Sequence, residues 1–157
     1  MKIKLIVVGK TDSSFIAEGI KEYEKRLKHY IGFEMIVIPD IKNTKNLSEA
    51  QQKQREGELI QGLFNAGDYV VLLDERGSEL SSVSFSQFIE KQMLSGVKNL
   101  IFIIGGPYGF SDLLYQKAQT KVSLSKMTFS HQMVRMIFVE QLYRAFTILK
   151  GEPYHHQ

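Results

Sequence analysis

A run of apolar residues at 100–104 leads directly into two glycines, Gly105 and Gly106. Consecutive apolar positions predict a strand that is covered on both faces, as in a parallel sheet. The two glycines have no side chains and lie where the strand ends, so backbone groups there can contact a ligand. The pattern therefore predicts a parallel α/β sheet with a binding site at the carboxyl end of this strand.

Strand and helix patterns alternate along the whole chain. Apolar runs predict strands at 2–8, 33–38, 68–73, 99–104 and 122–124. Helices are expected after a cap at Asp12 or Ser13, at 49–64 after Ser48, from a capping box of Ser84 with Gln87 to about 95, after Ser111 or Asp112, and at 133–150. This alternation predicts one domain, 1–157, built on a single parallel α/β sheet.

Composition excludes several classes of site. The chain of 157 residues has no cysteine, which rules out disulfides, thiolate nucleophiles and cysteine metal ligands. Its net charge is only +3, so an RNA substrate would require positive charge that is concentrated locally or doubled by oligomerisation. The first apolar run ends at Gly9 and is too short for a signal peptide or a membrane span. We expect a cytoplasmic protein without membrane contact.

The glycine loop 105–109 does not match the common phosphate-binding motifs. It lacks the G-x-G-x-x-G spacing of dinucleotide folds and the lysine of a phosphate-binding loop. Pro107 also removes an amide donor where an anion would need one. The residues themselves leave two readings open, a tight turn without a ligand and a site for a ligand that is not held by phosphate.

A second candidate position is Leu73, at the expected end of the third strand. Ligands of open α/β sheets collect outside the carboxyl ends of the strands, so Leu73 either forms a wall of the site or packs in the core. The acids that follow, Asp74 and Glu75, form either an acid/base pair or part of a solvated turn. Because Arg76 and Gly77 come next, we favour the turn.

The last helix is apolar around much of its circumference, more than one buried stripe requires. We therefore expect it to pack on the sheet and also on a second subunit. His131, just ahead of this helix, is a helix cap, a core hydrogen-bonding group or a catalytic residue. The four histidines lack the spacing of metal ligands, so no metal site is expected.

Several segments closely resemble the ribosomal RNA large-subunit methyltransferase H family. They occur in the family's order and lie at 4–10, 22–26, 72–77, 100–109, 123–131 and 151–155. The resemblance covers essentially the whole chain. It implies a small SPOUT-class enzyme that uses S-adenosylmethionine, without a metal, to methylate N3 of a pseudouridine in 23S ribosomal RNA. It also implies a homodimer, ribosomal particles as partner, helices on both faces of the sheet and a C-terminal trefoil knot.

The resemblance assigns a cofactor-binding role to eight positions. These are Leu73, Gly105, Leu124, Ser125, Lys126, Met127, Thr128 and Phe129. At Gly105 any Cβ atom is expected to intrude on the ligand. Lys126 is expected to contribute its backbone only, because a side-chain cation would repel the sulfonium.

The catalytic residues are less defined, and no general base stands out. Arg144 is a candidate for stabilising the anion or holding an RNA phosphate, and Tyr154 and His155 are candidates for orienting the base. In the family the tail that contains Tyr154 and His155 approaches the active site of the neighbouring subunit. The alternative function is a non-catalytic, ribosome-associated RNA-binding protein that kept the fold, and a nucleotide-binding oxidoreductase is a weaker third reading.

Overall fold

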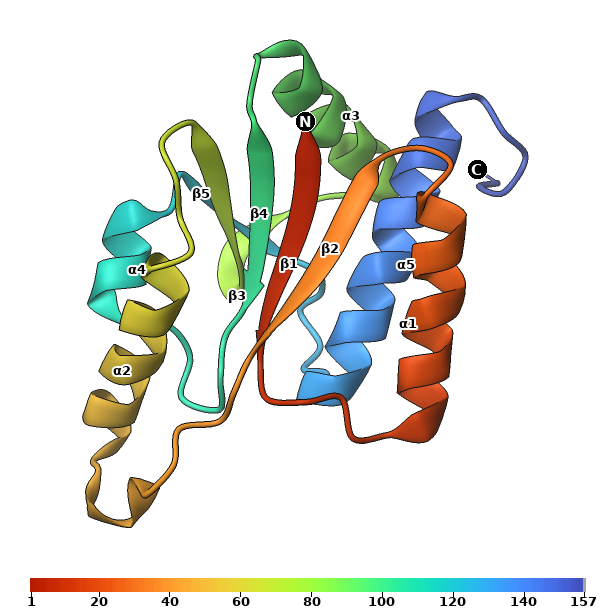
Figure 1. The fold of residues 1–157 in the computed structure, drawn as a ribbon. Helices are drawn as coiled ribbons and strands as arrows, with labels where there is room; N and C mark the ends of the chain where they lie inside the picture. The colour runs from red at the N-terminus through yellow and green to blue at the C-terminus, as the bar shows by residue number, and fades with distance from the viewer. Residues whose placement is uncertain (157) are drawn as a thin grey trace.

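A computed structural model describes residues 1–156 of the chain. It contains one five-stranded sheet, in which every pair of neighbouring strands is parallel and the order is β2-β1-β4-β3-β5 (Figure 1). The strands are β1 (Lys2–Val8), β2 (Gly32–Ile38), β3 (Asp68–Glu79), β4 (Asn99–Ile104) and β5 (Thr120–Ser123). The helices are α1 (Ser14–Leu27), α2 (Glu49–Gln61), α3 (Ser82–Leu94), α4 (Asp112–Lys117) and α5 (His131–Leu149), with a 3-10 turn at Thr44–Asn46.

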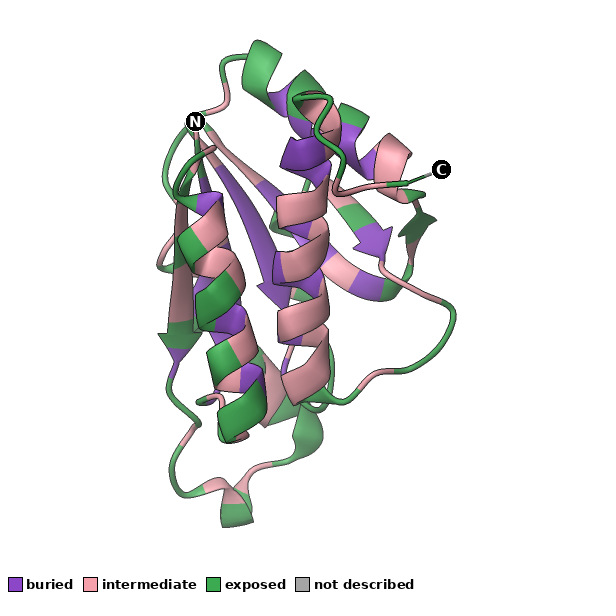
Figure 2. Ribbon diagram, turned by 90° about the vertical axis from the view of Figure 1, so that its right-hand side faces the viewer, coloured by how far each residue is buried: buried purple, intermediate pink, exposed green. Residues whose placement is uncertain are grey.

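Helices cover both faces of the sheet, as expected. Successive side chains of a strand point to opposite faces, so β1 and β4 contribute to two separate cores. Phe102 packs with α1, α3 and α5, whereas Ile103 faces α2 and α4. Figure 2 shows α1 and α5 side by side, with their buried residues turned toward the sheet. Burial on both faces explains the uninterrupted apolar runs.

Serine precedes each α-helix of the described chain. Ser48 forms a capping box with Gln51, in which each side chain bonds the other residue's backbone N–H. The predicted capping box of Ser84 with Gln87 is wrong, because Ser81 is the N-cap and its Oγ accepts from the Ser84 N–H at 3.0 Å. Sequence patterns cannot decide between two serines in one stretch, since both can accept the same kind of bond.

The third strand is longer than predicted. β3 continues past Leu73 to Glu79, and both Leu73 and Ser78 pair with Val122 of β5. Residues 74–77 therefore form a bulge in the strand and not the predicted turn, although Glu75 and Arg76 are solvent-exposed as predicted. Asp74 in this bulge is buried rather than solvated. β5 itself begins at Thr120, two residues before its predicted start.

The last helix starts at His131, two residues earlier than predicted. Phe138, Val139 and Leu142 are fully buried against the sheet and α3. The expected packing of its remaining apolar surface on a second subunit stays a prediction. The trefoil knot also stays a prediction, because strand order and pairing do not define how the C-terminal segment threads. Among the described helices, none is long and apolar enough to cross a membrane.

Candidate functional site

A cavity of about 810 Å³ lies at the bulge of β3 and at the carboxyl ends of β4 and β5. Three segments far apart in the sequence form most of its wall, residues 73–76, 104–110 and 123–129. All eight positions expected to bind the cofactor line it, namely Leu73, Gly105, Leu124, Ser125, Lys126, Met127, Thr128 and Phe129. The cavity falls within the size range of small-molecule sites and at the expected edge of an α/β sheet.

The glycine loop folds back on itself. The Gly109 N–H donates to the Gly106 carbonyl at 3.1 Å, and Gly109 has a φ of +82°. A Cβ on Gly105 would lie 3.2 Å from the Gly109 oxygen and 3.2 Å from a ring carbon of Phe110. A side chain at this position would therefore press on the loop's own backbone as well as on any ligand.

Glu56 of α2 supports the glycine loop from behind. Its side chain is buried, and a Cβ on Gly106 would lie 2.5 Å from the Glu56 Oε1. This Oε1 has no hydrogen-bond partner among the described residues. Burial raises the pKa of Glu56 above its ordinary value. The sequence analysis missed Glu56, because a single acid on a helix carries no signal of burial.

The segment 124–129 is held by short serine contacts. The Ser123 hydroxyl donates to the Ser125 carbonyl at 3.0 Å, and the Ser125 Oγ accepts from the Met127 N–H at 2.9 Å. The Lys126 side chain is 85 % exposed, with its Nζ 3.8 Å from Glu79. The structure thus confirms that Lys126 turns its side chain to solvent.

Asp74, which follows Leu73, accepts hydrogen bonds from other residues of the chain. The Asp74 carboxylate accepts from the Arg76 N–H at 2.9 Å and from the Tyr115 hydroxyl. Burial, and then the bond to Asp74, raise the pKa of Tyr115 to about 12, so Tyr115 stays a proton donor to Asp74. Asp74 and Tyr115 both line the cavity, and no short-range pattern links residues 41 positions apart.

His131 is the first residue of α5, exposed and on the cavity wall. It is neither the cap nor a core residue, because Ser130 is the N-cap and accepts from the Met133 N–H at 3.1 Å. No group of three or more potential metal ligands occurs among residues 1–156.

The three catalytic candidates gather in a second cluster around Glu140. Arg144 forms an ion pair with the Glu140 carboxylate, and the Tyr154 hydroxyl donates to it at 2.9 Å. An Arg144 nitrogen lies 3.2 Å from the His155 Nδ1, and the guanidinium lies 4.7 Å from the centre of the Tyr154 ring. Burial raises the pKa of Tyr154, and its hydrogen bonds to Tyr23 and Glu140 act in the same direction. Sequence reasoning missed Glu140, which joins the other three.

This Glu140 cluster is far from the cavity in the same chain. Of α5, only His131 and Val134 line the cavity. Arg144 follows Val134 by ten residues, about 15 Å along the helix axis. The structure thus brings the eight expected cofactor positions together at the cavity and the three catalytic candidates together around Glu140. Within one chain, these two groups lie apart.

Comparison with known proteins identifies the family. The family described as "Predicted SPOUT methyltransferase" matches residues 1–155. The chain is 63 % identical to the ribosomal RNA large subunit methyltransferase H of Parabacteroides distasonis and 62 % identical to that of Flavobacterium johnsoniae. It is 54 % identical to the protein of the same name from Bacteroides thetaiotaomicron. Each match spans 157 residues and the full length of both proteins. The chain therefore belongs to the SPOUT methyltransferase family.

Proposed function

We propose that this chain, as one domain, methylates N3 of a pseudouridine in 23S ribosomal RNA within ribosomal particles of the cytoplasm, with S-adenosylmethionine as methyl donor. The observation that carries the proposal is the convergence of eight positions from three separate segments, Leu73, Gly105 and 124–129, on one cavity of about 810 Å³. The names of the full-length relatives support a large-subunit ribosomal RNA as substrate.

The residues of the cavity fit this cofactor. The segment 124–129 is not helical and offers backbone donors and acceptors together with the apolar side chains of Leu124 and Phe129, which suits an adenine. Asp74 and Glu75 place carboxylates on a wall that also carries cations such as Arg76, while the Lys126 side chain is 85 % exposed. A carboxylate close to the sulfonium favours its positive charge. The bound cofactor supplies an electrophilic methyl group.

The Glu140 cluster fits the chemistry at the base. N3 of pseudouridine bears a weakly acidic proton between two carbonyls, and this proton must leave as the methyl group arrives. Arg144 can stabilise the resulting negative charge, and Glu140 fixes the guanidinium in place through an ion pair. The hydroxyl of Tyr154 and the ring of His155 can orient the base. Correct placement alone can lower such a barrier by about 7–11 kcal/mol.

The proposed mechanism uses two copies of the chain. One copy holds the methyl donor in its cavity, and the Glu140 cluster of a second copy reaches the same nucleotide. The large separation of the two groups within one chain supports this homodimer. A symmetric dimer has two such composite sites, because each copy provides both halves.

An activity assay with a cofactor-binding variant tests the proposal. Ribosomal particles from a strain that lacks this chain should accept labelled methyl groups, and mass spectrometry should place the label on a pseudouridine of 23S RNA. Calorimetry should show binding of S-adenosylmethionine but not of NAD or ATP. Gly105→Val should weaken cofactor binding more than about tenfold, because the new side chain contacts Gly109 and Phe110 and displaces the loop.

The matched control is Gly32→Val. Gly32 lies at the exposed start of β2, where a Cβ meets only the Lys2 side chain at 3.4 Å. This variant should bind the cofactor like the wild type. A wild-type chain that binds ribosomal particles but transfers no methyl group would favour the rival function, a non-catalytic RNA-binding protein.

A further inference from the structure

The bulge at residues 74–77 is fixed at both ends. At one end, buried Asp74 accepts from the Arg76 N–H and the Tyr115 hydroxyl. At the other end, a Cβ on Gly77 would lie 2.6 Å from the Lys121 carbonyl carbon and 2.6 Å from the Val122 nitrogen, so only glycine fits against β5. Bulges often re-aim a side chain beside an active site. Here the bulge presents the side chains of Glu75 and Arg76 to solvent.

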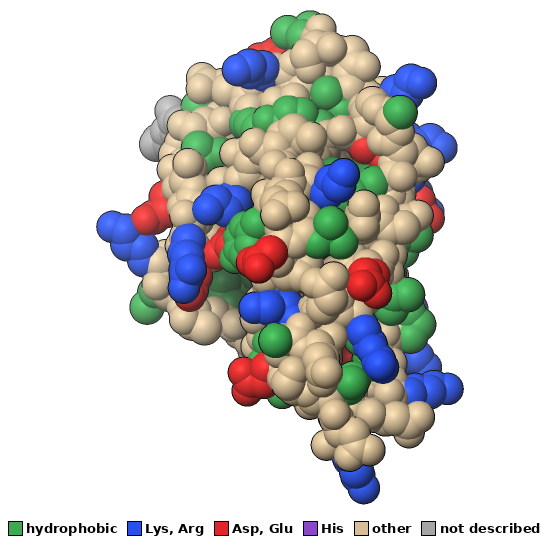
Figure 3. Space-filling model, turned by 90° about the vertical axis from the view of Figure 1, so that its left-hand side faces the viewer, with side chains coloured by type: hydrophobic (Ala, Val, Ile, Leu, Met, Phe, Trp, Pro, Cys, Tyr) green, Lys and Arg blue, Asp and Glu red, His purple; other side chains and the backbone are tan. Residues whose placement is uncertain are grey.

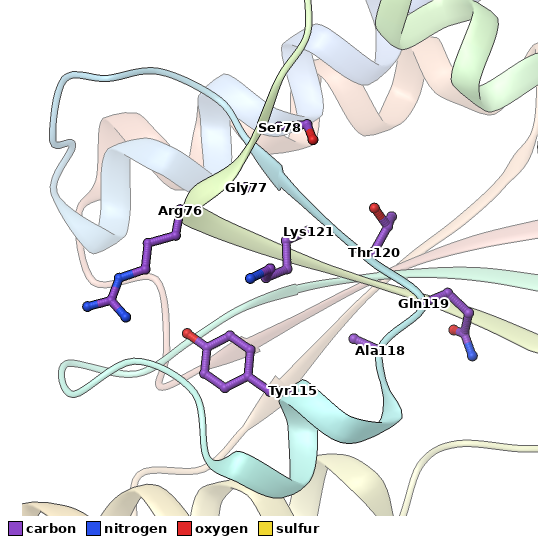
Figure 4. Close-up of a pocket in the computed structure, with 8 residues that line it drawn as sticks. All are labelled: Arg76, Gly77, Ser78, Tyr115, Ala118, Gln119, Thr120 and Lys121. Atoms are coloured by element: carbon purple, nitrogen blue, oxygen red, sulfur yellow. The ribbon is translucent and has the colours of Figure 1, made fainter.

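A second pocket, of about 510 Å³, lies beside this bulge. Its lining consists of Arg76, Gly77, Ser78, Tyr115 and residues 118–121. Figure 4 shows the Arg76 and Lys121 side chains extending toward the same side, with the Tyr115 ring beneath them. The Lys121 Nζ lies 5.6 Å from the centre of that ring. The hydroxyls of Ser78 and Thr120 belong to the same pocket.

Neither cation of this pocket forms an ion pair within the described chain. The ion pairs of residues 1–156 involve Arg26, Lys126 and Arg144, and none involves Arg76 or Lys121. On the surrounding face, cationic and acidic side chains are interspersed (Figure 3). The mixed charges of this face as a whole therefore attract RNA only weakly. A local pair of cations that forms no ion pair contributes more to RNA binding. Two cations with hydroxyl donors suit a phosphate group.

The position of the pocket links it to the reaction. Arg76 and Tyr115 line both this pocket and the larger cavity, so the two spaces adjoin. We infer that Arg76 and Lys121 bind a backbone phosphate of the substrate RNA close to the nucleotide that is methylated. This inference rests on the proposed function. Such a contact positions the RNA strand and carries no base specificity.

Charge-removing variants test the inference. We expect Arg76→Gln with Lys121→Gln to raise KM for unmethylated ribosomal particles about tenfold and to reduce kcat much less. The dependence of log kcat/KM on log salt concentration should become shallower by about 1.5, because each cation that no longer neutralises a phosphate reduces the slope by roughly 0.7–0.9. Each single variant should show a smaller effect of the same kind. Both side chains are exposed, and a wild-type midpoint of urea unfolding for the double variant reports an intact fold.

The matched control is Lys98→Gln, which removes the same charge. Lys98 is exposed and precedes β4 at the amino edge of the sheet, opposite the cavity. Its KM and salt dependence should equal those of the wild type. A double variant with wild-type KM and wild-type salt dependence overturns the phosphate site while leaving the proposed function intact. A wild-type chain without methyl transfer overturns the proposed function instead.

Discussion

Single residues at the site are constrained by contacts within the protein as much as by a ligand. A Cβ on Gly77 would overlap the backbone of β5, a Cβ on Gly106 would overlap the buried Glu56 carboxyl, and a Cβ on Gly105 would press on the loop itself at 3.2 Å. Close packing of this kind fixes the backbone that a ligand meets. We conclude that the cavity wall is built before any ligand binds.

Glu56 gives the molecule a pH dependence of stability that can be measured. Burial raises its pKa in the folded chain, and the charge of Asp40 acts in the same direction. Below its ordinary pKa, Glu56 is protonated in both states. As pH rises, Glu56 of the unfolded chain ionises first, so the free energy of unfolding falls until the folded-state pKa is passed. Glu56→Gln, which does not titrate, should therefore gain stability over the wild type as pH rises.

Urea unfolding of both proteins at about pH 4 and about pH 8 measures this difference. The other carboxyls contribute equally to the pH dependence of the free energy of unfolding in both proteins. Their contributions therefore cancel in the difference between the two. Glu58→Gln, an exposed carboxyl on the same helix, controls for loss of charge from α2. Equal pH dependence in the two variants would contradict the role of burial at Glu56.

At the scale of helices and strands, most of the fold follows from local patterns. The uninterrupted apolar run of β4 and the serines before the helices predict elements that the structure contains. The patterns fail at the end of β3, where the bulge and the final residues depend on pairing with β5, more than 40 positions later. Glu56 and Tyr115 were missed for the same reason, because burial and long-range hydrogen bonds leave no local signature.

The cap of α5 is an element that connects stability with the cavity. Ser130 follows the segment 124–129 directly, and its Oγ accepts from the Met133 N–H. Ser130→Ala should lower the free energy of unfolding by about 1 kcal/mol, as for other N-cap serines replaced by alanine. Ser13→Ala is the matched control, because Ser13 caps α1 without a side-chain hydrogen bond. This variant should lower the free energy of unfolding by less than Ser130→Ala does. Equal losses in urea unfolding would show that the Ser130 bond contributes nothing.

At the scale of the whole molecule, α5 carries both halves of the proposed site on one helix. Its first residues lie at the cavity, whereas Glu140 and Arg144 lie in its second half and bind the tail that follows the helix. A helix is too rigid to bring its own two ends together. Two copies could align the cavity of one with the cluster of the other, which is the physical basis of the proposed dimer.

Mixed dimers test this arrangement. Gly105→Val damages only the cavity, and Arg144→Gln damages only the cluster, so each variant alone should be nearly inactive. In a mixed dimer, purified through a different tag on each copy, the intact cavity of the Arg144→Gln copy meets the intact cluster of the Gly105→Val copy. One of the two sites is then complete, and the rate should be about half that of the wild type. If each chain used its own cluster, the mixed dimer would be as inactive as either variant, and light scattering must first show that the wild type has twice the mass of one chain.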